Sequence, residues 1–145
     1  MFSQKVRRLM DRERMLTALP QATVRQAALL MAGNNTGAVL VVENEALLGI
    51  FTERDVVFRV IAQGLDTDTT PLAAVMTATP VTVEPERTYG HALQLMYERG
   101  FRHLPVVSDG GRILGVFSVR DALPREVSTA VGLADFNEQV NDALG

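Results

Sequence analysis

The sequence of 145 residues contains no cysteine. This absence excludes disulfide bridges, thiolate metal ligands and cysteine nucleophiles, and it suits a reducing compartment. The chain has 2 histidines, too few and too poorly spaced for a familiar metal site. No run reaches the roughly 18 consecutive apolar residues that a membrane span needs. The N-terminal residues also lack the apolar core of a signal peptide, so we expect a soluble, cytoplasmic protein that has no contact with a membrane.

An excess of positive charge is missing as well. The chain carries 14 Lys and Arg residues against 17 Asp and Glu residues, a net charge of −3. The electrostatic footprint of a nucleic-acid-binding protein is therefore absent, and a nucleic-acid partner is not expected. Basic residues do cluster near the N-terminus, where a solvated surface explains them; they are Lys5, Arg7, Arg8, Arg12 and Arg14.

Motifs of common catalysts are also absent. No serine lies in a Gly-x-Ser-x-Gly elbow. The stretch 33–37 is rich in Gly and Asn but lacks the Gly-Lys-Ser/Thr ending of a P-loop. Gly110 and Gly111 precede an expected strand and do not open a helix, as a dinucleotide-binding fingerprint requires. These absences predict a protein that is not an enzyme and holds no catalytic cofactor or metal.

The feature that is present is an internal repeat. Gly-Ile-Phe-Thr-Glu-Arg-Asp at 49–55 matches Gly-Val-Phe-Ser-Val-Arg-Asp at 115–121, 66 positions further on. Upstream, the match continues at a spacing of 65 positions, and one extra residue in the turn at 108–111 explains the difference. So many matches in one order indicate two copies of one structural unit. The upstream pairs are Pro20 and Pro85, Thr23 and Thr88, Ala27 and Ala92, Leu30 and Leu95, and Met31 and Met96.

Each copy predicts the same order of elements: short strand, helix, strand, strand, helix. Apolar residues at helical spacing predict the first helix. A continuous apolar run of strand length then predicts a strand buried on both faces, and a turn leads to its hairpin partner. These three elements are expected at 23–32, 37–42 and 47–51 in the first copy and at 88–98, 104–107 and 112–117 in the second.

The last helix of each copy begins at a hydroxyl residue. Thr52 and Ser118 stand where a helix N-cap belongs. The first copy predicts a helix at 55–62 that Gly64 ends, whereas Pro124 interrupts the helix of the second copy. Because neither half buries both faces of its sheet alone, we expect an α/β (α+β) fold of two pseudo-symmetric β-α-β-β-α units packed through their sheets.

The domain boundaries follow from the repeat. The first unit is expected at 6–64, a polar linker at 65–71 and the second unit at 72–124. The C-terminal tail at 125–145 has apolar residues about four positions apart. This spacing predicts a helical tail that packs on the module or pairs with another chain.

The repeated motif resembles that of the cystathionine-β-synthase (CBS) domain, whose tandem pairs are called Bateman modules. The pattern is Gly-hydrophobic-hydrophobic-(Thr/Ser)-x-x-Asp at 49–55 and 115–121, together with (His/Arg)-x-x-Pro-Val-Val at 102–107, and the resemblance covers about 6–124. It implies a stand-alone regulatory module that binds an adenosine nucleotide (AMP, ADP, ATP or NAD) in clefts between the copies. It further implies a homodimer, with an output either through that dimer or through an unknown target protein.

The resemblance also implies roles for individual residues. The carboxylates of Asp55 and Asp121 would accept hydrogen bonds from ribose hydroxyls, while Thr52 and Ser118 would contact the ribose or the phosphate. Arg54 and Arg120 would contact phosphate or lie on a solvated surface. The adenine would lie among Thr77–Val81 and Arg102–Pro105 in one half and Arg12–Thr17 and Asn35–Ala38 in the other, with Thr77, Val81, Arg102, His103, Pro105, Thr36, Gly37 and Ala38 as site residues.

Each of these roles has a structural alternative. A hydroxyl residue followed three positions later by an acid also resembles a capping box. An acid in the first helical turn contributes roughly 0.3–1 kcal/mol through the helix dipole. His103 is either a phosphate donor, a pH-sensitive contact or a satisfied histidine at the start of a strand.

The two copies differ at one strand edge. Arg102 and His103 align with Gly37 and Ala38, so only the second copy brings cationic donors there. Phosphate binding depends on such charge-assisted hydrogen bonds, and we expect the cleft of Ser118 and Asp121 to bind nucleotide more tightly. The alternative function is a non-catalytic scaffold whose ligand clefts are vestigial.

Overall fold

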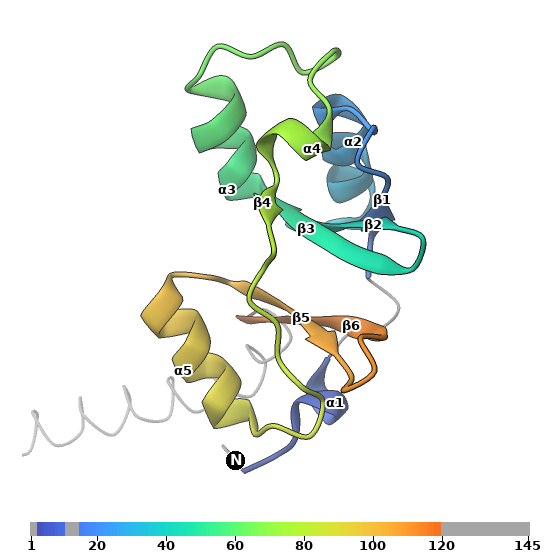
Figure 1. Ribbon diagram of the computed structural model, residues 1–145. Coiled ribbons are helices and arrows are strands. Elements are labelled where there is room, and N and C mark those ends of the chain that lie inside the picture. Colours follow the sequence, from blue (N-terminus) through green and yellow to red (C-terminus); the bar gives the residue numbers. More distant parts are fainter. Residues whose placement is uncertain (1–2, 11–14, 120–145) are drawn as a thin grey trace, which may run out of the picture.

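The computed structural model describes residues 3–10 and 15–119 (Figure 1). Arg12 and Arg14 lie outside these residues, as do Arg120, Asp121, Pro124 and the tail at 125–145. The elements in chain order are α1 (Val6–Leu9), β1 (Thr17–Ala18), α2 (Val24–Asn34), β2 (Ala38–Glu43), β3 (Ala46–Thr52), α3 (Glu53–Asp55), the π-helix η1 (Val56–Ile61), α4 (Leu72–Val75), β4 (Thr77–Ala78), α5 (Tyr89–Arg99), β5 (His103–Val107) and β6 (Ile113–Ser118).

The two sheets follow the two copies of the repeat. One sheet has the order β1-β2-β3-β4, and the other pairs β5 with β6. The hairpins share one register, because Ala38 pairs with Thr52 as His103 pairs with Ser118. Each hairpin also has a register shift at the repeated Val-Val pair, at 41/42 and at 106/107. The expected α+β fold of two pseudo-symmetric units is confirmed.

The sheets lie one above the other in the middle of the molecule, with helices beyond them at both ends (Figure 1). Alternate residues of β2 point to opposite faces. Val39 and Val41 belong to a core with α2, whereas Ala38 and Leu40 belong to a cluster that Ile113 and Val116 of β6 contact. Strand β2 is therefore buried on both faces, as its continuous apolar run predicts.

Two short segments are exchanged between the copies. Val6 and Met10, at the start of the chain, pack into the core of the second copy. Leu72 and Val75 of α4 pack into the core of the first copy, where the Leu72 N–H donates to the Ala22 carbonyl at 2.8 Å. The first residues of each copy therefore pack in the core of the other copy, and this exchange ties the two halves together.

The repeated threonines at 23 and 88 cap the two long helices. Thr23 forms a capping box with Gln26, and Thr88 accepts a hydrogen bond from the His91 N–H at 3.2 Å. The expected α-helix at 55–62 is wrong in detail. It starts at Glu53 and continues as a π-helix, in which the Ala62 N–H donates to Val57, five residues back.

Candidate functional site

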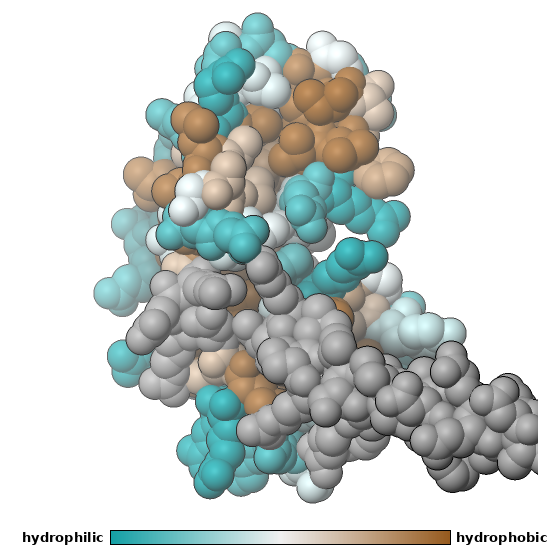
Figure 2. Space-filling view, turned by 180° about the vertical axis from the view of Figure 1, so that it is seen from behind, coloured by the Kyte–Doolittle hydropathy of each residue, from teal (hydrophilic) through white to brown (hydrophobic). Residues whose placement is uncertain are grey.

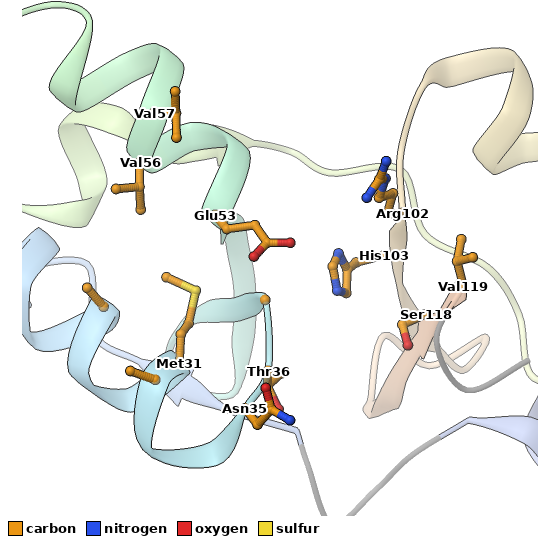
Figure 3. Close-up of a pocket in the computed structure, with 13 residues that line it drawn as sticks. Met31, Asn35, Thr36, Glu53, Val56, Val57, Arg102, His103, Ser118 and Val119 are labelled. Atoms are coloured by element: carbon orange, nitrogen blue, oxygen red, sulfur yellow. The ribbon is translucent and has the colours of Figure 1, made fainter. Parts of the chain in front are cut away.

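A cavity of about 900 Å³ opens between the two copies (Figure 3). Helix α2 and the π-helix η1 form its apolar wall, with Met31, Val56 and Val57. Polar residues come from the loop before β2, the start of α3 and the facing ends of β5 and β6; they are Asn35, Thr36, Glu53, Arg102, His103 and Ser118. This size and this mixture of surfaces are typical of sites for small organic ligands.

The same backbone hydrogen bond closes both hairpins at the rim of the cavity. The Glu53 N–H donates to the Gly37 carbonyl at 3.0 Å, and the Val119 N–H donates to the Arg102 carbonyl at 3.1 Å. Positions 37 and 102 are thus equivalent, as the sequence repeat predicts. The second copy presents a guanidinium at this edge, where the first copy has only a glycine.

Opposite charges face each other across the cavity. In Figure 3 the carboxylate of Glu53 points from the first copy toward His103 and Arg102 of the second. Burial lowers the pKa of His103 below its usual 6.5, Glu53 opposes this shift and Arg102 adds to it. The imidazole is therefore neutral at pH 7, where it offers one donor and one acceptor.

Asp55 belongs to a capping box in this structure. One carboxylate oxygen accepts from the backbone N–H and the hydroxyl of Thr52, at 3.0 and 3.2 Å. Its other oxygen lies 3.4 Å from Nε of Arg59. The carboxylate is buried, with 7% of the residue exposed, and neither Asp55 nor Thr52 lines the cavity. The capping alternative is confirmed for the first copy.

The CBS domain family matches the sequence twice, at residues 6–62 and 72–126. The chain belongs to the CBS domain family.

Relatives of known sequence agree with this assignment. The CBS domain-containing protein YhcV of Bacillus subtilis is 36% identical over 128 residues, which are 88% of this chain and 84% of that protein. An uncharacterized protein of Methanopyrus kandleri is 34% identical over 116 residues, or 79% of this chain. The match spans 59% of the Methanopyrus protein.

Solved structures share the fold. An uncharacterized conserved protein of Pyrococcus horikoshii has a TM-score of 0.80 at 27% identity, over 87% of this chain and 94% of that one. A CBS domain protein of Pyrobaculum aerophilum, solved in complex with AMP, has a TM-score of 0.75 at 28% identity, over 87% and 99% of the two chains.

The expected adenine-binding group at Thr77–Val81 is divided between the two CBS copies. The sequence places it with Arg102–Pro105, but β4 pairs with β3 of the first copy, and the Thr77 hydroxyl lies 3.5 Å from Asp55. Val81 packs instead against the core of the second copy. The chain crosses from one sheet to the other within this segment, and its contact with adenine stays a prediction.

Other expected site residues fall into two sets. Thr36, Gly37, Arg102, His103 and Ser118 line the cavity. Ala38 and Pro105 are buried within their sheets, and the guanidinium of Arg54 lies over the ring of Phe58, 5.1 Å from its centroid. None of these last three residues lines the cavity.

Sequence reasoning missed Glu53 and the apolar wall of the cavity. The signal for Glu53 was its alignment with Val119, a place where the two CBS copies differ in charge. Met31 is 7% exposed and packs in the core of the first copy, yet it also borders the cavity. Within the part of the chain that the structure describes, no helix is long and apolar enough to cross a membrane.

Proposed function

We propose that this CBS pair is a regulatory module that binds an adenosine nucleotide, such as AMP, ADP, ATP or NAD, in the cavity between its copies. The observation that carries the proposal is the guanidinium of Arg102 at the rim of a cavity of about 900 Å³. No ion pair joins Arg102 to another residue of 3–10 or 15–119. Arginine binds phosphate through charge-assisted, often bidentate hydrogen bonds.

The two walls of the cavity suit the two ends of a nucleotide. Met31, Val56 and Val57 offer apolar surface for a purine ring, and Arg102 and Ser118 lie on the opposite side for the phosphate. The AMP complex of the Pyrobaculum neighbour supports the choice of an adenosine ligand. Binding then acts on a partner protein or on a second copy of the chain.

A second copy is the partner that the surface favours. Apolar side chains are exposed on one end of the molecule, and Figure 2 shows them gathered over the first CBS copy. Their exposed fractions are 64% for Leu29 of α2, and 60% for both Phe58 and Ile61 of η1. Such a cluster marks a protein interaction surface, and we propose a homodimer that uses it.

One observation favours the alternative of a scaffold without a ligand. Asp55, the expected ribose acceptor of the first copy, is already bound by Thr52 and Arg59. A scaffold would keep the capping box of Thr52 and Asp55 and lose nucleotide affinity. Only a ligand-binding measurement separates the two functions.

The test is thermal unfolding of the full chain with each ligand. A ligand at a hundredfold excess over its dissociation constant adds roughly 2.7 kcal/mol of stability. For a chain of this size we expect AMP, ADP, ATP or NAD to raise Tm by several degrees, with GMP as the matched control giving a smaller rise. If no adenosine ligand raises Tm at millimolar concentration, the scaffold function replaces the proposed one.

A further inference from the structure

The cavity contains one unusual charge. Among the described residues that line it, Glu53 alone is acidic. Its equivalent in the second copy is Val119, which lines the same cavity from the other side. The carboxylate is therefore, like the guanidinium of Arg102, a point at which the two repeated walls differ.

The backbone holds Glu53 in a fixed position. Its N–H donates to the Gly37 carbonyl, and the preceding residue, Thr52, caps the helix with Asp55. The side chain folds over Gly37, because a Cβ built there would lie 3.0 Å from a carboxylate oxygen of Glu53. A side chain at position 37 would push the carboxylate aside, so the glycine makes room for it.

The charges around the cavity nearly cancel. Arg102 contributes one positive charge and Glu53 one negative charge, and the pKa of His103 is lowered by burial so that its imidazole is neutral at pH 7. A single phosphate finds a partner in Arg102. The further phosphates of a di- or triphosphate would approach the carboxylate of Glu53. Both groups are negative, and their repulsion disfavours binding of these ligands.

We propose that Glu53 is a specificity-determining residue whose carboxylate restricts the cavity to adenosine ligands of low negative charge, nucleosides and monophosphates, against triphosphates. This inference rests on the proposed nucleotide binding. It assigns the choice among AMP, ADP and ATP to a residue outside the repeated Thr/Ser-x-x-Asp motif. Removing the charge at position 53 then widens the range of ligands.

The experiment compares Glu53→Gln with the wild-type chain by calorimetry at pH 7.5. We expect ATP affinity to rise roughly tenfold in the variant, which corresponds to about 1.4 kcal/mol, because the carboxylate no longer repels the further phosphates. Adenosine carries no phosphate, so its affinity should change by less than about twofold. AMP should lie between them. Glu45→Gln, in the exposed turn between β2 and β3, removes the same charge away from the cavity and should change none of the three.

Inorganic tripolyphosphate separates the two proposals, because it carries the charge of ATP without adenosine. Glu53→Gln should bind it more tightly than the wild-type chain does. If neither chain binds any adenosine ligand, the proposed function fails, and the tripolyphosphate result still tests Glu53. Equal affinities of both chains for ATP and for tripolyphosphate overturn the role of Glu53, as does an equal gain for ATP and adenosine.

Discussion

His103 lies at the rim of the cavity between a guanidinium and a carboxylate. Burial is the strongest influence on its pKa and disfavours the charged imidazolium; Glu53 favours the charged form, and Arg102 disfavours it. The result is a pKa below the usual 6.5. In the unfolded chain the imidazole regains its ordinary pKa, so the unfolded state binds a proton more readily than the folded state does.

This difference predicts a pH dependence of stability. Just below pH 6.5 the unfolded chain binds more protons than the folded chain. The free energy of unfolding therefore decreases as the pH is lowered. The contribution of His103 is complete above about pH 6.5 and is lost as the pH falls through its lowered folded pKa. His103→Asn should therefore lose less stability than the wild-type chain between about pH 7 and pH 5, as measured by urea unfolding.

The control for this measurement is the other histidine of the chain. His91 lies on α5 and is not among the residues that line the cavity. His91→Asn is the matched variant, because it removes the same side chain from a position outside the cavity. If the free energy of unfolding of His103→Asn changes with pH as much as that of the wild-type chain, His103 does not cause the pH dependence.

Individual residues differ in how far the sequence predicts them. Thr52 and Asp55 allowed two interpretations. The structure shows the cap, because the Asp55 carboxylate turns back to its own helix end, and the ribose contact stays a prediction. Arg102 and His103 were predicted from the alignment of the copies. Glu53 was not, because its place in the cavity depends on the space above Gly37, which only the folded backbone defines.

At the scale of elements, the long helices and the hairpins could be predicted with their bounds. The short strands were expected only by their order, and the short helices α1 and α4 were not expected. Eleven residues of α2 show a helical period, whereas the 4 residues of α1 or α4 are too few to show one. The repeated glycine at position 49 is the one sequence feature that reflects α4 and β4, because these elements pack directly against it. A Cβ there would lie 2.5 Å from the Met76 sulfur and 2.8 Å from the Thr77 carbonyl, so the segment approaches β3 too closely for a side chain.

The exposed apolar faces of α2 and η1 predict a dimer. We expect light scattering to give about twice the chain mass of 15.8 kDa. Ile61→Glu places a charge on this face, whose desolvation opposes association, and should shift the protein toward the monomer. Gly110→Glu adds the same charge in the open turn between β5 and β6 and should leave the dimer intact. A wild-type mass near that of one chain over a wide concentration range would rule the dimer out.

At the scale of the whole molecule, duplication produces two similar halves with different chemistry. The fold repeats its register, its bulges and its rim hydrogen bonds. The charges do not repeat, since Gly37 is the equivalent of Arg102 and Glu53 is the equivalent of Val119. The tighter binding expected at the cleft of Ser118 and Asp121 stays a prediction, because Asp121 lies outside the described residues.

In the proposed function Arg102 holds the phosphate of an adenosine nucleotide, and calorimetry tests this role most directly. AMP and adenosine are titrated into the wild-type chain, into Arg102→Ala and into Arg99→Ala, an exposed arginine at the end of α5. A hydrogen bond to a charged group contributes about 1.5–3 kcal/mol, so Arg102→Ala should weaken AMP at least about tenfold. The affinity of Arg102→Ala for adenosine should change by less than about twofold. Arg99→Ala should bind both ligands as the wild-type chain does. An AMP affinity that Arg102→Ala leaves unchanged, or an equal loss for AMP and adenosine, would contradict the account.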